Sequence, residues 1–182
     1  MRSVVMIQCV TQDGKLEYCS RICCTNTLKN ALRLKMLNPE CQVVVLYKNI
    51  ITYGFREKYY LEARRQGVVF VRYTDQSPPE VYLERRGARQ ALVVRIQEHV
   101  FGRTLVFEPD LLALSTPIVP APETARLATM LNVPLSAEGF FLEAHLKMRP
   151  MEFADDGMLL AGMAHYPKFI EESITHALAC AG

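Results

Sequence analysis

The sequence has no segment that predicts export or membrane insertion. No early stretch combines a basic start, an apolar run and a small-residue cleavage site. No apolar run approaches the roughly 20 residues that span a bilayer. We therefore expect a cytoplasmic globular protein without a membrane span. Its 182 residues, half of them apolar, are enough for one substantial core or two small ones.

The sequence also lacks an excess of charge of one sign. Its formal net charge is +2, so no sustained cationic field would attract nucleic acid, and we expect no nucleic-acid partner. Arginine and lysine are frequent in the middle third, but glutamates such as Glu57, Glu62 and Glu84 are interleaved with them. This mixture predicts a solvated face. No internal repeat or low-complexity tract is present.

The opening third alternates strand and helix patterns. In chain order we expect strand 4–9, helix 20–37, strand 42–47, helix 55–65 and strand 68–73. The run over residues 42–47 (QVVVLY) is rich in β-branched side chains, which is typical of a sheet covered on both faces. Gly67 is expected to cap the second helix. The alternation predicts a parallel sheet.

The pattern changes after residues 77–79 (SPP) to that of a β-meander. Short antiparallel strands are expected over residues 81–85, 91–97 and 104–107. Beyond the meander the sequence predicts, in order, a buried strand over 110–114, a helix over 123–131, strands over 140–143 and 158–162, and a closing helix over 168–181.

Four of the six cysteines lie close together in the sequence. Cys9 follows the first expected strand, and Cys19, Cys23 and Cys24 lie where the first helix is expected to begin, giving the spacing C-x9-C-x3-C-C. Ligands of open α/β sheets bind beyond the carboxyl ends of strands, and helix amino termini favour thiolates. Because no signal peptide is present, a disulfide framework is not expected.

This spacing leaves several interpretations open. The four thiolates could hold an iron-sulfur cluster or a structural zinc, or the cysteines could be small buried apolar side chains. A redox dithiol between Cys23 and Cys24 is a further alternative, although adjacent cysteines rarely reach good disulfide geometry. Cys41 and Cys180 are expected to be packed or semi-exposed thiols outside the cluster.

The cysteine segment resembles the cluster-binding segment in the A subunits of heterodisulfide reductases. The resemblance begins with residues 6–10 (MIQCV), 18–24 (YCSRICC) and 29–32 (KNAL). Further stretches match in the same order: 46–47 (LY), 52–57 (TYGFRE), 67–68 (GV), 114–120 (LSTPIVP), 139–145 (GFFLEAH) and 164–174 (AHYPKFIEESI). The resemblance covers nearly the whole chain. It implies a [4Fe-4S] cluster beside a flavin, with the ligands Cys9, Cys19, Cys23 and Cys24.

The family's core is similar to thioredoxin reductase, in which a pyridine-nucleotide-type domain interrupts an FAD domain. The resemblance therefore implies an α/β fold with two lobes. Residues 1–108 would be the iron-sulfur-binding remainder of the nucleotide-type, Rossmann-like lobe, with a parallel sheet and a β-meander. Residues 109–182 would be the returning part of the FAD-binding lobe. Residues 110–120 (DLLALSTPIVP) match the crossover, and residues 156–162 (DGMLLAG) match the last flavin-contacting strand and turn.

Two departures from the family pattern affect the flavin site. The second motif normally ends in Gly-Asp, but here Gly162 precedes Met163, so backbone amides of Met163 and Ala164 would have to replace the acid. The chain also has no G-x-G-x-x-G, the loop that cradles an ADP moiety. We therefore expect the other half of the FAD site to come from another chain or from a preceding segment. Nothing supports an NAD site on this chain.

The resemblance places two residues on the flavin side as candidate catalytic groups. His165 follows the last flavin motif, and Lys29 belongs to the expected cluster helix. From the sequence alone, His165 could equally be a hydrogen-bonded structural residue and Lys29 a solvated helix lysine. His99 and His176 have no expected role, and Pro167 is expected to open the closing helix. The implied flavin contacts are Thr116, Pro117, Gly162, Met163, Ala164, His165, Lys168 and Phe169.

The resemblance implies an oxidoreductase component of an anaerobe that is active within a complex and performs flavin-based electron transfer or bifurcation. Its implied partners are another chain carrying the N-terminal FAD-binding half, other heterodisulfide-reductase-like subunits, and a hydrogenase, formate dehydrogenase or ferredoxin module. The alternatives are a non-catalytic zinc-binding or assembly module and a thiol oxidoreductase that uses Cys23 and Cys24.

Overall fold

The computed structural model describes residues 1–11, 18–100 and 102–182. The chain forms two compact units. Unit 1 comprises Met1–Leu16 and Cys23–Pro117, and unit 2 comprises Glu17–Ile22 and Ile118–Gly182. Within the described ranges, no helix combines the length and the apolar character needed to cross a bilayer.

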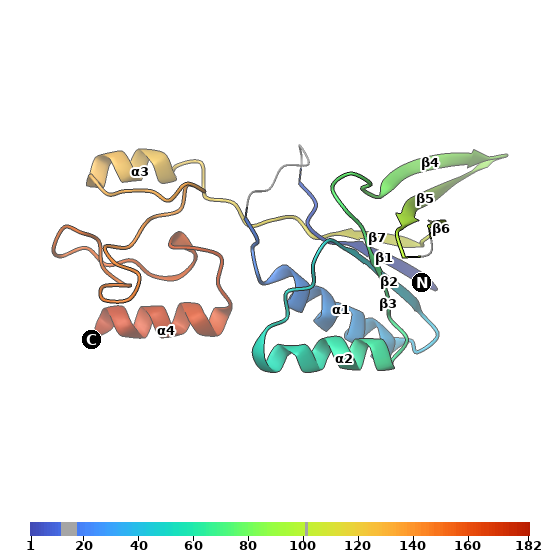
Figure 1. Cartoon of the computed structure of the whole chain (residues 1–182), viewed down its shortest axis with the longest axis horizontal. Helices are drawn as coiled ribbons and strands as arrows, with labels where there is room; N and C mark the ends of the chain where they lie inside the picture. Colours follow the sequence, from blue (N-terminus) through green and yellow to red (C-terminus); the bar gives the residue numbers. More distant parts are fainter. Residues whose placement is uncertain (12–17, 101) are drawn as a thin grey trace. The chain divides into compact units, whose positions relative to one another are not determined.

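Unit 1 is built on a four-stranded sheet (Figure 1). Its strands are β1 (Ser3–Ile7), β2 (Gln42–Tyr47), β3 (Val69–Arg72) and β7 (Leu111–Leu114), in the order β3-β2-β1-β7. Every neighbouring pair is parallel, as the alternating pattern predicts. The expected burial of the last strand is wrong. Because β7 lies at the edge of the sheet, Leu111 is 45% exposed and Leu114 is 52% exposed.

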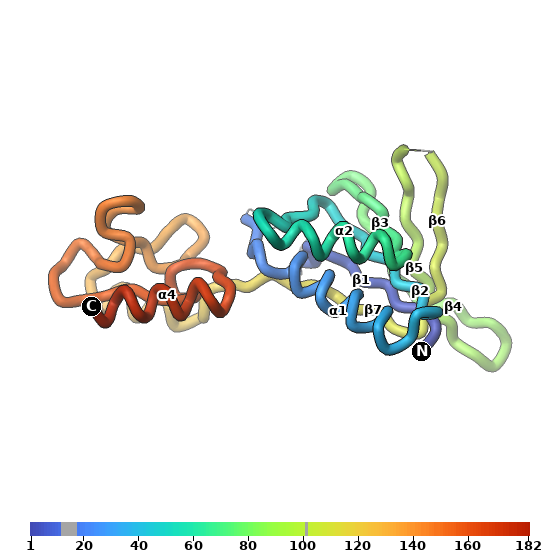
Figure 2. Tube along the Cα trace, turned by 90° about the horizontal axis from the view of Figure 1, so that it is seen from below, coloured from blue at the N-terminus to red at the C-terminus, as the bar shows by residue number. Residues whose placement is uncertain are grey.

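Both faces of the central strands are covered, as the run over residues 42–47 predicts. Helices α1 (Cys23–Leu37) and α2 (Glu57–Arg65) lie side by side on one face, as Figures 1 and 2 show. Successive side chains of a strand point to opposite faces. The core on the helix side includes Val4, Met6, Leu28, Ala31 and Val45. The core on the other side includes Val5, Ile7, Leu46, Val94 and Ile96.

The second cover of the sheet is the β-meander. Its strands β4 (Glu80–Arg86), β5 (Arg89–Glu98) and β6 (Arg103–Phe107) form a separate antiparallel sheet, which confirms the predicted meander. Buried residues of β5, such as Val94 and Ile96, pack against the parallel sheet. Unit 1 therefore has three layers, with the parallel sheet in the middle.

Unit 2 has little regular structure. Helices α3 (Thr124–Leu131) and α4 (Ile170–Ala181) confirm the two predicted helices, and a small apolar cluster contains Ala128, Val133, Phe153 and Leu160. The strands expected over 140–143 and 158–162 do not form. Isolated bridges, Leu135 with Phe141 and Glu152 with Leu159, occur instead. Gly139 and Gly157, both with positive φ, precede these segments, and Gly162, also with positive φ, ends the second.

All four helices begin later than expected, at Cys23, Glu57, Thr124 and Ile170. Helix α1 begins at Cys23 because Arg21 has φ 58°, a left-handed conformation that cannot continue a right-handed helix. Helix α4 begins at Ile170, and its N-cap is Phe169 in an extended conformation. Pro167 therefore does not open this helix. A short 3-10 turn, η1 (Gly54–Arg56), precedes α2.

Candidate functional site

The four candidate ligand cysteines form no disulfide and lie in different environments. Cys9 follows β1 and has φ 57°, and Cys19 is exposed. Cys23 and Cys24 open helix α1, where Cys24 is 3% exposed and its Sγ lies 3.7 Å from the carbonyl oxygen of Asn49. The donor set suits an iron-sulfur cluster or zinc, because no disulfide consumes any of these thiols.

The described residues do not gather three or more side chains that could hold a metal ion. Cys9, Cys23 and Cys24 belong to unit 1, whereas Cys19 belongs to unit 2. The convergence of the four thiols therefore stays a prediction.

Residues 18–22, which carry Cys19, are tied to unit 2 by side-chain contacts. The Tyr18 hydroxyl donates to the carbonyl of Ile118 at 2.8 Å, and the amide of Ile118 donates to Ser20 Oγ at 2.9 Å. The Arg21 guanidinium pairs with Glu172 at 2.6 Å. These short bonds from three nearby side chains explain why the segment belongs to unit 2 although α1 belongs to unit 1.

An aromatic group supports the same segment. The ring of Tyr18 meets Phe140 edge-on with centroids 5.8 Å apart, and Tyr166 lies 5.3 Å from Phe140 and 6.0 Å from Tyr18. Phe140 is only 2% exposed. Burial is the main cause that raises the pKa of both tyrosines, with Glu138 adding to it, so both hydroxyls stay protonated at neutral pH.

A buried polar network lies beneath the first turns of α1. Gln8, which is fully buried, donates from Nε2 to Thr27 Oγ1 at 2.8 Å, and Thr27 Oγ1 lies 3.2 Å from Ser115 Oγ. The Tyr73 hydroxyl donates to the carbonyl of Gln8. This network fixes the chain directly before Thr116 and Pro117, the expected crossover contacts.

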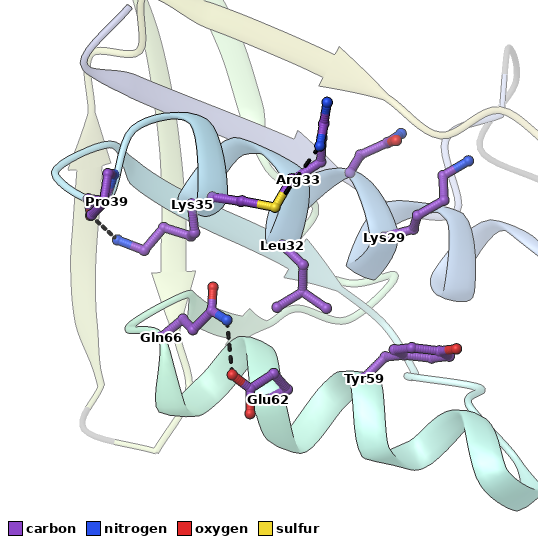
Figure 3. A pocket seen from close by; sticks show the side chains of 10 residues that line it. Lys29, Leu32, Arg33, Lys35, Pro39, Tyr59, Glu62 and Gln66 are labelled. Carbon is purple, nitrogen blue, oxygen red and sulfur yellow. Dashed lines mark hydrogen bonds between the residues drawn. The ribbon is translucent and has the colours of Figure 1, made fainter.

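Lys29 lies on the exposed side of α1, at one end of a groove between α1 and α2. The groove has a volume of about 960 Å³ and includes Leu32, Met36 and Tyr59 among its apolar lining. In Figure 3 the Lys29 side chain extends away from Tyr59 and Glu62 of α2. Lys29 and the other candidate, His165, belong to different units. Their common role stays a prediction.

His165 is held by the carboxylate of Glu143, for which the sequence predicts no role. Its Nε2 lies 2.7 Å from Oε2 of Glu143, and the two side chains are 15% and 8% exposed. Burial by itself would raise the pKa of Glu143. Hydrogen bonds from its own backbone amide and from His165, helped by the charge of Lys168, outweigh burial and lower that pKa. Glu143 is therefore ionised at neutral pH.

His176, for which the sequence predicts no role, stacks on His165. The ring centroids are 5.6 Å apart and the planes differ by 23°. Burial lowers the pKa of His176, and the charges of Lys168 and His165 lower it further. No sequence signal could reveal this contact, because the two histidines lie on different elements. His165 follows a 3-10 turn, and His176 lies on helix α4.

The remaining flavin candidates flank this pair. Gly162, with φ 65°, opens the 3-10 turn η2 (Gly162–Ala164), where Met163 is half exposed. Lys168 is half-buried, and burial and then the charge of Arg21 lower its pKa. The amide of Phe169 donates to Glu172 at 2.7 Å. These residues share one neighbourhood in unit 2, whereas Thr116 and Pro117 belong to unit 1.

Comparison with known proteins gives relatives among the A subunits of heterodisulfide reductases. The chain is 38% identical over 98% of its length to the iron-sulfur A subunit of the CoB--CoM heterodisulfide reductase from Methanocaldococcus jannaschii, and covers 27% of it. It is 35% identical over 97% of its length to the A subunit of the ferredoxin:CoB-CoM heterodisulfide reductase from Methanosarcina acetivorans, and covers 22% of that protein.

A third relative is the A subunit of the H(2)/formate:CoB-CoM heterodisulfide,ferredoxin reductase from Methanococcus maripaludis, with 35% identity over 99% of the chain and 27% of the relative. The chain thus spans about a quarter of the length of these curated relatives. No protein-family model matches it.

Solved structures confirm the fold. Thioredoxin reductase of T. acidophilum matches 99% of the chain with a TM-score of 0.58 and 13% identity, and the chain covers 50% of it. Thioredoxin reductase of Lactococcus lactis matches 99% of the chain with a TM-score of 0.59 and 12% identity, with the same 50% coverage. The α/β, thioredoxin-reductase-like fold is therefore established. As the cysteine segment and its companion motifs predict, nearly the whole chain is homologous to part of the A subunits of heterodisulfide reductases.

Proposed function

We propose that the chain is part of an oxidoreductase component that holds a [4Fe-4S] cluster and contributes part of an FAD site. The main support is the match of nearly the whole chain to a relative whose name calls it an iron-sulfur protein. The proposed cluster ligands are Cys9, Cys19, Cys23 and Cys24, none of which is in a disulfide. When bound, the cluster and the flavin supply the electron-transfer chemistry. The protein holds and orients them.

Iron content tests the ligand assignment. Anaerobically reconstituted chain should contain about four irons, and Cys23→Ser should abolish the cluster. Cys180→Ser is the matched control, because Cys180 donates to the carbonyl of Leu160 in unit 2 and is outside the proposed set. Cys41→Ser should also retain the iron. Stoichiometric zinc without iron would contradict the cluster and support the zinc-binding alternative.

The burial of Cys24 argues against the thiol-oxidoreductase alternative. A reactive thiol must be accessible and ionised, but Cys24 is 3% exposed and lies against the Asn49 carbonyl oxygen. Its neighbour Cys23 is the preceding residue of the same helix. Successive helical side chains diverge, so the two sulfur atoms are poorly placed for a disulfide.

For the flavin, we propose a half-site that needs a second contribution. The proposed contacts are Thr116, Pro117, Gly162, Met163, Ala164, His165, Lys168 and Phe169. Residues 109–182 would be the returning part of the FAD lobe, and residues 1–108 the remainder of the nucleotide-type lobe. Because the chain has no G-x-G-x-x-G, titration of the isolated chain with FAD should show affinity weaker than about 1 μM. Tighter binding without a partner would contradict the half-site.

Lys29 and His165 are the proposed residues that tune the flavin. Reduction adds negative charge to the ring, and a nearby cation or hydrogen-bond donor stabilises that state more than the oxidised one. A charge-assisted bond contributes about 1.5–3 kcal/mol, so replacing either residue by Ala should lower the two-electron potential by roughly 30–65 mV. Redox titration of the reconstituted complex, with exposed His99→Ala as control, tests this. Unchanged potentials would return both residues to structural roles.

We also propose that the chain works within a complex of heterodisulfide-reductase-like subunits, with electron transfer or bifurcation at the flavin. The names of two relatives refer to ferredoxin, and one of them also to H(2) and formate. This supports a hydrogenase, formate dehydrogenase or ferredoxin module as partner. Native mass measurement of the purified complex should find such subunits, and a lone chain with full cofactor content would contradict the proposal.

A further inference from the structure

Two side chains of unit 2, Glu143 and His176, form a compact group with His165. Glu143 lies 2.7 Å from Nε2 of His165, and His176 stacks on the same imidazole from helix α4. The remaining ring nitrogen of His165, Nδ1, is buried and has no hydrogen-bond partner among the described residues. The Nδ1 of His176 is in the same situation. A buried polar atom without a partner is costly, so such atoms are often reserved for a ligand or a reaction.

The chemistry of the pair assigns a distinct task to each nitrogen. An ionised carboxylate can only accept hydrogen bonds, so Glu143 requires a proton on Nε2 of His165. The neutral imidazole is then the Nε2–H tautomer, with a lone pair on Nδ1. Protonation adds a hydrogen at Nδ1 and leaves the bond to Glu143 intact. Proton gain and loss therefore take place at Nδ1.

His176 restricts the orientation of the ring. Stacked rings prefer parallel, offset arrangements, and the 23° angle between these planes fits one. Two further charges affect these side chains. Lys168 lowers the pKa of both Glu143 and His176, and Glu172 raises the pKa of His176. Burial and Lys168 favour the neutral form of His176.

We propose that Glu143 and His176 are positioning residues that hold the His165 imidazole as its Nε2–H tautomer and make Nδ1 its proton-exchanging atom. This rests on the proposed function, which places His165 beside the flavin. Beside a bound flavin, the Nδ1–H of the His165 imidazolium would deliver a proton to the flavin. The imidazolium would then become the neutral Nε2–H ring.

Nitrogen NMR of the histidine rings in the isolated chain tests the positioning without any cofactor. When the imidazole is neutral, the Nε2–H tautomer should exceed the other by roughly tenfold or more, because a charge-assisted bond selects it. Glu143→Gln should reduce that preference towards equality, and Glu143→Asp should partly restore it. Glu171→Gln, at an exposed position on α4, is the matched control and should change nothing. Retention of the tautomer in a folded Glu143→Gln variant would overturn the inference.

The role of His176 is tested by ring mobility. His176→Phe keeps a stacked ring and should leave the His165 signals sharp, whereas His176→Ala should broaden them. If the His165 signals were equally sharp in both variants, His176 would not be a positioning residue. The tautomer reports on positioning, and the flavin potential of His165→Ala reports on the proposed function, so the two can fail separately.

Discussion

Unit 1 and unit 2 are stabilised by different kinds of contact. In unit 1, two apolar clusters lie on opposite faces of one parallel sheet, and their central residues are almost completely buried. In unit 2 the apolar cluster is small, and bonds such as Arg21–Glu172 and Glu143–His165 join segments far apart in the sequence. Apolar packing depends little on pH, whereas the strength of these ionisable contacts changes with pH. The two units should therefore respond differently to the same change of sequence or solvent.

The largest expected effect is the loss of Phe140 from unit 2. Phe140 is 2% exposed and contacts both Tyr18 and Tyr166, so Phe140→Ala should lower the free energy of unfolding by about 3–5 kcal/mol. With so small a core, unit 2 should lose its structure first, seen as loss of its NMR signals. Leu146→Ala, at a 70% exposed position, should stay within about 0.5 kcal/mol. Comparable effects of the two variants would contradict this account of unit 2.

The equivalent change in unit 1 is Leu28→Ala. Leu28 is fully buried between α1 and the sheet, and its truncation should cost about 2–5 kcal/mol in urea unfolding followed by circular dichroism. Met36→Ala on the same helix is the control, because Met36 is 62% exposed. If Leu28→Ala disturbed the NMR signals of unit 2 as strongly as those of unit 1, the separation of the units would fail.

Acidification should destabilise unit 2 before unit 1. The folded state lowers the pKa of His176, Glu143 and Glu172, so protonation favours unfolding in each case. The histidine contribution is present above its unfolded pKa of about 6.5 and is lost below it. The glutamate contributions are lost as pH falls from about 4.3 through the lower folded values. NMR signals of both units, followed from pH 7 to 3, measure this. Loss of the unit 1 signals at a higher pH than those of unit 2 would contradict this prediction.

The smallest expected effect concerns Lys168. Its cation is half-buried, and burial and Arg21 lower its pKa, so the charge costs stability. Lys168→Met should leave the free energy of unfolding unchanged or raise it by up to about 1 kcal/mol. Flavin binding by the assembled complex should weaken. A clear loss of stability would mean that Lys168 serves unit 2 structurally, through Glu143 and Glu172.

Much of unit 1 could be predicted because its signals are local. The β-branched run of β2 and the glycines of the meander specify strand and turn within a few residues. Unit 2 depends on contacts distant in sequence, and apolar segments such as residues 140–143 pack without pairing. The left-handed Arg21, which shortens α1, has no sequence signature, since arginine rarely adopts that conformation. Family motifs predict roles for the cysteines and His165, whereas the stacking of His176 on His165 joins positions distant in sequence and has no motif.

The path of the backbone has a practical consequence. The chain leaves unit 1, contributes residues 17–22 to unit 2, returns at Cys23, and leaves unit 1 again after Pro117. A single cut at Pro117 therefore cannot yield two complete pieces. The longer fragment would retain Tyr18, Ser20 and Arg21 without their partners, and the shorter one would lack the ion-pair partner of Glu172. Gene fragments or fusions that treat residues 118–182 as an independent module would need residues 17–22 supplied as well, in trans or through circular permutation.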